Sequence, residues 1–274
     1  RDHHEVILVD FPEKFEKEFT PDCMVVDPFA FVEKLKSPLF ASKFTTIYHQ
    51  GACSDTMNYN VKYMMRHNFD YSHDLLHRCM ENSINLIYAS SAAIYGIGRT
   101  TPLYEDMQCF PRNIYAKSKK IFDDYALTFI DKSESQIVGL RYFNVYGPWE
   151  HRKNKMSSVV NQFKKQIDSD KKIKIFEKSN KYFRDLDDVI SVNTHFGENE
   201  KISGIFNCGS GEAKPFSEIP KHLAKHYNFE IEEIKMPKKL EDKYQKYTQA
   251  NLNRLTHVGR YRAPMLSLEE GIQR

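Results

Sequence analysis

The sequence predicts an α/β protein, with a doubly wound sheet of parallel strands and a smaller α/β lobe at the carboxyl-terminal end. Two observations predict this class. Short apolar runs, rich in β-branched and aromatic residues, recur along the chain and have the length of buried strands. Helical stretches lie between several of these runs and are long enough to cross from one parallel strand to the next.

The expected elements follow in order along the chain. Strands are predicted at EVILVD (5–10), CMVVD (23–27), TTIYHQ (45–50), INLIYAS (84–90), QIVGLRYFN (136–144) and GIFNCG (204–209). Helices are predicted at 59–82 and 115–131. From about residue 148 the pattern changes to charged helices and short loops, including 156–167 and 240–255. We therefore expect a main domain over residues 1–147 and a lobe over residues 148–274, with some segments of the lobe returning to the main sheet.

Composition narrows the classes of function. The chain has 274 residues, 41% of them apolar and 28% charged, which is ordinary for a globular protein with a full core. A net charge of +3 is too small to predict a nucleic-acid platform. The five cysteines are scattered and form no Cys-x-x-Cys, so neither a disulfide framework nor a metal site is predicted. No membrane span or signal peptide is apparent, so we expect a cytoplasmic enzyme or binding protein.

Small or polar residues follow four of the predicted strands. Ligands bind outside the carboxyl ends of the strands in sheets of this class. The residues at those positions are Asp10, the segment Gly51-Ala52-Cys53-Ser54, the pair Ser90 and Ser91, and Asn144. Strands often end in turn residues, which explains any one of these sites without function. Together they predict one shared cleft.

Tyr115 and Lys119 open the helix that follows this cleft. Four residues are about one helical turn, so both side chains project from one face. A nearby ammonium group favours the phenolate and lowers the pKa of a tyrosine toward that of a general base. Of 16 tyrosines, only Tyr115 has lysine four positions later. A solvated surface pair remains the alternative interpretation of this spacing.

One expected feature is missing from the sequence. A dinucleotide site in such a sheet opens with a glycine-rich turn after the first strand, yet the first glycine here is Gly51. The sequence reads as though it begins near the second strand, whose terminal Asp10 would contact the adenosine ribose. Either the first βα unit is absent from this sequence, which we favour, or the protein does not bind dinucleotide in the usual way.

Three motifs carry a resemblance to a known family. YASSAAIYG (88–96), YAKSK (115–119) and RYFNVYGP (141–148) together resemble the extended short-chain dehydrogenase/reductase family of nucleotide-sugar epimerases and dehydratases, which have a Rossmann-like sheet. Longer stretches are similar to the branch of this family that acts on ADP-heptose, a lipopolysaccharide precursor; these are HQGACSDT (49–56), KYMMRHNFDYSHDLL (62–76), SQIVGLRYFNVYGPWEHRKNKM (135–156) and KYQKYTQANL (243–252).

The resemblance implies epimerisation at C6 of the heptose by transient oxidation and re-reduction. A tightly held NADP, or NAD, would accept hydride and return it to the opposite face of the sugar. By resemblance, Tyr115 is one acid/base group, Lys119 holds the ribose and lowers the pKa of Tyr115, and Ser91 hydrogen-bonds the reacting oxygen. Lys153 would be the second acid/base group; without the resemblance, it reads as one more surface lysine in HRKNK (151–155).

The resemblance also implies the binding residues and partners. Residues 1–147 would bind the dinucleotide through Asp10, Lys14, Gln50, Gly51, Ala52, Cys53, Ser54, Tyr115, Lys119 and Val145. The lobe would bind an ADP-sugar, the substrate residues being Ser91, Asn144, Lys153, Lys155, Phe176, Glu177, Lys178, Ser179, Arg184 and Tyr244. A homo-oligomer is expected. Two alternatives stay open: another nucleotide-sugar epimerase or dehydratase, and a non-catalytic nucleotide-binding relative. A dehydratase would usually carry Asp-Glu where Ala92 and Ala93 follow the active serine.

Overall fold

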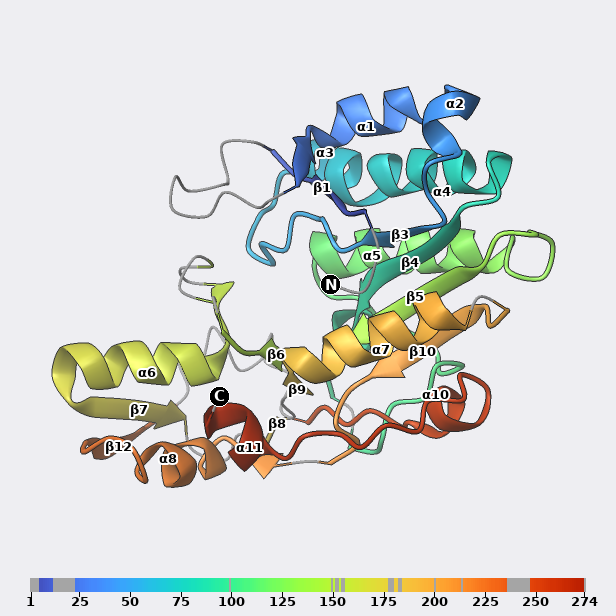
Figure 1. Cartoon of the computed structure of the whole chain (residues 1–274). Helices are drawn as coiled ribbons and strands as arrows, with labels where there is room; N and C mark the ends of the chain where they lie inside the picture. Colours follow the sequence, from blue (N-terminus) through green and yellow to red (C-terminus); the bar gives the residue numbers. More distant parts are fainter. Residues whose placement is uncertain are drawn as a thin grey trace.

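A parallel sheet lies between two layers of helices, and a second lobe extends from one end of it (Figure 1). This computed structural model describes residues 5–11, 23–98, 100–148, 150, 153, 156–176, 180–181, 184–199, 201–212, 214–235 and 247–273, with backbone only at 180–181 and 184–187. The predicted α/β class is confirmed. Within the described residues, no helix combines the length and the apolar character needed to span a bilayer.

The main sheet has four strands in the order β10-β5-β4-β3, and all three pairings are parallel. The strands are β3 (Thr46–His49), β4 (Asn85–Ser91), β5 (Ile137–Tyr142) and β10 (Gly204–Cys208). Two further strands, β1 (Ile7–Val9) and β2 (Met24–Val26), form a separate parallel pair. Strands β4, β5 and β10 are buried along almost their whole length, which explains their nearly continuous apolar sequences.

Helices cover both faces of the main sheet. The first layer contains α1 (Pro28–Lys34), α2 (Pro38–Ala41), α3 (Val61–Met65), α4 (Tyr71–Glu81) and α5 (Ile114–Leu127). Helix α7 (Leu186–Glu198) lies against the other face (Figure 1). Two apolar clusters fill these interfaces, one around Leu76, Leu86 and Phe122 and the other around Val138 and Phe196. Each buried side chain of this size contributes about 1.5–3 kcal/mol to folding.

The predicted helical stretch over 59–82 is confirmed, but it contains a π turn that was not predicted. The chain forms α3 and α4, joined by a π-helical turn, η2 (Arg66–Asp70). A π turn accommodates one extra residue in a helix, and such turns are frequent at functional sites. Asn68 lies at its centre and is 1% exposed. The periodicity of the sequence indicated the helical segment but not this insertion.

The second lobe contains its own small core. Helix α6 (Val159–Asp170) leads into β7 (Lys172–Phe176), which pairs in parallel with β12 (Glu230–Ile234). Phe163, Ile173 and Ile219 belong to its apolar cluster, to which α8 (Glu218–Leu223) and α11 (Leu268–Gln273) contribute. Although they follow residue 147, β10 and α7 belong to the main sheet and its helical layer.

Short elements complete the described chain. Strand β6 (Val145–Tyr146) pairs in parallel with β9 (Arg184–Asp185), and β8 (Asn180–Lys181) pairs antiparallel with β11 (Lys214–Pro215). The 3₁₀ turn η3 (Ala92–Tyr95) follows β4, and α10 (Asn253–His257) packs on β10. The β6–β9 pair therefore joins the segment after β5 to the start of α7.

Candidate active site

The carboxyl ends of the main strands bring the predicted cleft residues to one edge. Ser91, at the end of β4, lies opposite Tyr142 at the end of β5. The Tyr142 hydroxyl donates to Gln50 Oε1 at 2.8 Å and accepts from Asn193 Nδ2 at 2.9 Å, while Gln50 Nε2 donates to Asn193 Oδ1 at 3.0 Å. Helix α7 and the segment after β3 are thus joined across this edge.

Tyr115 lies in the first turn of α5 and interacts with Ser91. Asn113 caps the helix, its Oδ1 accepting from the Ala116 N–H at 2.7 Å, so the position of Tyr115 is fixed by local structure. Ser91 is extended, and its Oγ accepts from the Ala93 N–H at 3.2 Å. Burial raises the pKa of Tyr115, and its interaction with the Ser91 side chain opposes this effect. A phenol and a hydroxyl therefore meet at the strand edge.

Lys119 lies one turn further along α5 and is 5% exposed. Its Nζ donates to the Ala89 carbonyl of β4 at 2.7 Å. Burial lowers the pKa of Lys119 to about 8, and the charge of Asp123 acts in the opposite direction. Contrary to the prediction, the pKa of Tyr115 is raised, because burial dominates, and the Ser91 side chain rather than Lys119 is the group that acts against burial.

The segment 50–54 is fastened to the helices by Asn68. Asn68 Oδ1 accepts from the Cys53 N–H at 2.8 Å, and its Nδ2 donates to the Cys53 carbonyl at 3.0 Å. The same Nδ2 lies 3.1 Å from Ser118 Oγ, which donates to the Tyr115 carbonyl at 2.7 Å. Asn68 was not among the site residues predicted from the sequence. A usable signal was present, since Met64, Asn68 and Ser72 follow one another at four-residue spacing on the buried face.

Asn144, Val145 and Arg184 lie beside this edge. Asn144 has φ of +38°, a left-handed conformation that asparagine tolerates better than most residues. Such backbone positions cluster at functional sites. Val145 follows in β6 and is the register partner of Arg184 in β9. The structure therefore brings together the backbones of one predicted cofactor residue and one predicted substrate residue.

The remaining predicted residues are less closely gathered. Asp10 follows β1, and its Oδ1 accepts from the Phe11 N–H at 2.8 Å. Phe176 ends β7 opposite Ile234, and Lys153 is exposed to solvent. Six predicted site residues lie outside the described residues: Lys14, Lys155, Glu177, Lys178, Ser179 and Tyr244.

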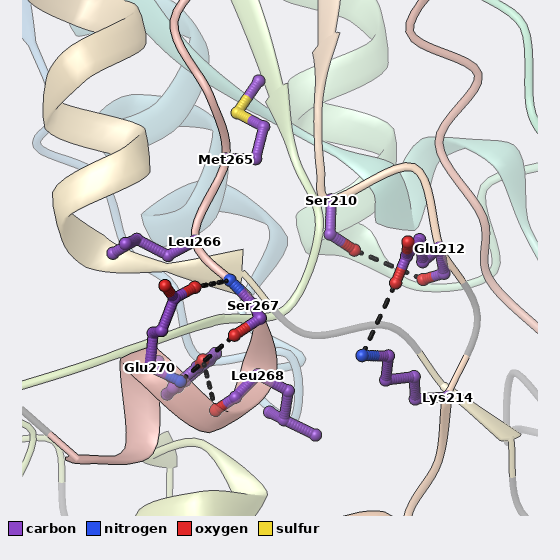
Figure 2. A pocket seen from close by; sticks show the side chains of 9 residues that line it. Ser210, Glu212, Lys214, Met265, Leu266, Ser267, Leu268 and Glu270 are labelled. Atoms are coloured by element: carbon purple, nitrogen blue, oxygen red, sulfur yellow. Dashed lines mark hydrogen bonds and ion pairs between the residues drawn. The ribbon is translucent and has the colours of Figure 1, made fainter.

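A cavity of about 200 Å³ lies in the second lobe (Figure 2). It lies between the segments 210–214 and 265–270, with Tyr146 among its lining residues. Glu212 and Lys214 form an ion pair at 3.5 Å, and the Ser267 N–H donates to Glu270 at 2.7 Å. None of the predicted catalytic residues lines this cavity. We therefore take the edge of the main sheet as the candidate active site.

The groups at this edge fit a nicotinamide dinucleotide. A Cβ built on Gly51 would meet open space, so a ligand can approach the backbone there. The Lys119 ammonium has three donors, and the bond to Ala89 uses one, which leaves donors for ribose hydroxyls. Asp10 supplies a carboxylate at the end of β1, in the separate β1–β2 pair. These positions correspond to the ligand-binding ends of the strands in a doubly wound sheet.

A doubly wound parallel sheet that gathers serine, tyrosine and lysine at its carboxyl edge is the arrangement of nicotinamide-dependent short-chain enzymes. The model of the NAD dependent epimerase/dehydratase family matches residues 33–209. The chain belongs to this family, as the match spans more than half of its length.

The chain is similar to individual enzymes of this family. The chain is 46% identical over 239 residues to the ADP-L-glycero-D-manno-heptose-6-epimerase of Brachyspira hyodysenteriae, covering 85% of this chain and 75% of that protein. The crystal structure of the Helicobacter pylori enzyme of the same name matches with a TM-score of 0.83 and 29% identity, over 98% of this chain and 85% of that one. A UDP-N-acetylglucosamine 4-epimerase from Methanobrevibacter ruminantium matches with a TM-score of 0.84 and 19% identity, over 98% and 88% of the two chains, and supports the fold alone.

Proposed function

We propose that the protein converts ADP-D-glycero-D-manno-heptose to ADP-L-glycero-D-manno-heptose, using NADP, or NAD, as a resident cofactor. The observation that carries the proposal is the interaction of the Tyr115 and Ser91 side chains beside Lys119, in a chain 46% identical to a protein with this activity. The reaction inverts C6 and leaves the net oxidation state unchanged. The product would serve as a precursor of lipopolysaccharide.

The bound nicotinamide would supply the hydride acceptor and donor. Asp10, Lys14, the segment Gln50-Gly51-Ala52-Cys53-Ser54, Lys119 and Val145 are the residues proposed to hold it. A lysine side chain at position 14 would favour NADP through the additional phosphate. Asn68 fixes the Cys53 backbone, so this segment would bind with little loss of conformational freedom.

Two acid/base groups would divide the proton transfers. In the oxidation step, Lys153, as the neutral amine, would take the proton from the C6 hydroxyl while the hydride passes from C6 to the cofactor. In the reduction step, Tyr115 would donate its proton to the C6 oxygen as the hydride returns to the opposite face. Exchange of one proton with solvent at each residue would then return Lys153 to the amine and Tyr115 to the phenol. Burial raises the pKa of Tyr115 and keeps its phenol protonated near neutrality, which suits the donor role. Ser91 hydrogen-bonds the same oxygen and orients it.

The substrate would lie between the main sheet and the second lobe. Asn144 and Lys155 are proposed to contact the heptose, and Phe176 to Ser179, Arg184 and Tyr244 the ADP group. A guanidinium group presents paired donors to phosphate oxygens, which suits Arg184 to the diphosphate. The pairing of β6 with β9 supports this arrangement, because it sets Arg184 beside the segment that follows Asn144.

A direct assay tests the proposal. The purified protein is incubated with ADP-D-glycero-D-manno-heptose, and the product is identified by chromatography and proton NMR. The nucleotide released by denaturation is identified by mass spectrometry. We expect the L-glycero product and bound NADP. A protein that retains nicotinamide but acts only on another nucleotide sugar would refute the substrate assignment, and one that neither retains nicotinamide nor turns over any nucleotide sugar would refute enzymatic function.

We further propose that the protein acts in the cytoplasm as a homo-oligomer. The five cysteines are free thiols, which fits a reducing compartment. The family resemblance supports the oligomer. Light scattering coupled to size-exclusion chromatography measures its mass, and a particle with the mass of one chain would contradict this expectation.

A further inference from the structure

A buried ion pair fastens the helix that carries Tyr115 and Lys119 to strand β5. The Asp123 carboxylate is fully buried and accepts from Arg141 Nε at 2.9 Å and from the Tyr88 hydroxyl at 3.1 Å. Arg141 is 3% exposed and donates through Nη1 to the Tyr95 hydroxyl and the Glu105 carbonyl, both at 2.9 Å. The pair is therefore surrounded by hydrogen-bonding partners from β4, η3 and the segment before α5.

The backbone makes room for this arrangement. A Cβ on Gly139 would lie 2.5 Å from the Tyr88 hydroxyl, so only glycine at that position of β5 lets Tyr88 extend toward Asp123. A buried ion pair often stabilises a fold less than apolar residues of the same volume would. Stability of the fold alone therefore does not explain why this ion pair is buried here.

Asp123 lies one helical turn beyond Lys119 and two turns beyond Tyr115, and therefore on the same face of α5. The three side chains form a row along one helix. Lys119 reaches the carbonyl of Ala89, while Asp123 is held from the other side by Arg141. Any loss of the carboxylate would change both the docking of α5 and the electrostatic potential at Lys119.

We propose that Asp123, held by Arg141, is a positioning residue of the active site, which keeps Lys119 charged and holds α5 in place against β5.

The charges around Lys119 support this role. His49 faces it from β3, but burial and the charge of Lys119 lower the pKa of His49 to about 3, so the imidazole is neutral in the working range. Tyr115 precedes it on α5 and is a neutral phenol, while Arg141 on β5 is neutralised by Asp123. Asp123 is the group that raises the pKa of Lys119 against burial. Its removal should therefore lower this pKa below about 8.

The test compares Asp123→Asn with Asp124→Asn in the full chain. Asp124 is the next residue on α5, exposed and paired with Lys120 at 2.5 Å, and provides the matched control. Lys119 is titrated by NMR in protein labelled with ¹³Cε-lysine, its resonance being assigned with Lys119→Met. A nearby opposite charge typically moves a pKa by about 1–3 units. We expect the Lys119 midpoint to fall by about one pH unit or more in Asp123→Asn and to stay unchanged in Asp124→Asn.

The effect of Asp123 on the pKa of Lys119 does not depend on the proposed function, whereas its effect on the rate of epimerisation does. The alkaline limb of kcat/KM should fall together with the NMR midpoint. If the NMR midpoint falls but no epimerase activity is found, the proposed function fails and this inference holds. If the midpoints of Asp123→Asn and wild type agree within about 0.3 pH units, the inference is overturned.

A second variant addresses folding. Asp123→Asn leaves Arg141 as an uncompensated buried charge, and that alone can unfold the protein. The double variant Asp123→Asn with Arg141→Gln removes both charges. We expect it to fold and to show the lowered Lys119 midpoint. Failure of the double variant to fold would overturn the inference in favour of a purely structural pair.

Discussion

Asn68 and Cys53 exchange two hydrogen bonds across 15 positions of sequence: Asn68 Oδ1 accepts from the Cys53 N–H, and Asn68 Nδ2 donates to the Cys53 carbonyl. Because Nδ2 also lies 3.1 Å from Ser118 Oγ, one amide fastens the segment 50–54 to helix α5. The π turn η2 places Asn68 between the two. A residue that is part of neither segment therefore sets their relative position.

Replacing Asn68 with alanine should weaken cofactor binding. The change leaves the partly buried N–H and carbonyl of Cys53 without these partners, which costs up to about 1–3 kcal/mol per unsatisfied group. We expect affinity for NADP to fall by about 10–100-fold, as measured by isothermal titration calorimetry on protein stripped of nucleotide. The control is Asn199→Ala, an exposed asparagine at the end of α7. Equal affinities in the two variants would contradict the proposed role of the loop.

Tyr115→Phe should abolish turnover while leaving cofactor bound. The hydroxyl is the group that interacts with Ser91, and its loss removes a proton donor, worth about 10²–10⁴-fold in rate. Tyr125→Phe on the same helix removes a hydroxyl that lies 2.6 Å from His77 Nε2, and serves as the control. The measurement is kcat with the ADP-heptose substrate, together with the nucleotide content of each protein. Retained activity in Tyr115→Phe would remove Tyr115 from the mechanism.

Lys153→Met should be comparably damaging to kcat but harmless to stability. Lys153 is exposed, so its replacement leaves no buried group unpaired. If it supplies the second base, we expect a loss of about 10²-fold or more in kcat and an unchanged Tm. Lys164→Met, at an exposed position of α6, is the matched control. Near-normal turnover in Lys153→Met would show that proton removal from C6 depends on another group.

The sequence predicted those parts of the fold and site that depend on local pattern. The apolar runs placed each strand of the main sheet to within two residues at either end, because a buried strand must be apolar over its own length. The four-residue spacing of Tyr115 and Lys119 placed both on one face of α5. The small residues after β4 marked Ser91, which does interact with Tyr115.

The features that the sequence did not predict depend on contacts between residues that are far apart in the sequence. Asn68 and Ser118 are 50 positions apart, and Asp123 and Arg141 are 18 apart, so no local periodicity connects either pair. The direction of the Tyr115 pKa shift was wrong for the same reason. Spacing predicted a neighbouring ammonium, whereas the extent of burial, which comes from packing of the whole sheet, decides the shift.

His49→Gln should make the protein more resistant to acid. The pKa of His49 is lowered to about 3 in the folded state, against about 6.5 in an unfolded chain. Below pH 6.5 the unfolded state therefore binds more protons than the folded state. The free energy of unfolding then decreases as the pH falls toward 3. Between about pH 7 and about pH 4.5, this single group should remove about 2.5 kcal/mol from the free energy of unfolding.

Glutamine does not titrate and keeps an amide donor for Ser72 Oγ, which lies 2.7 Å from His49 Nε2. Urea unfolding at the two pH values should show a smaller loss for His49→Gln than for wild type or for His226→Gln, an exposed control. Identical losses in all three proteins would mean that His49 becomes protonated without unfolding the chain.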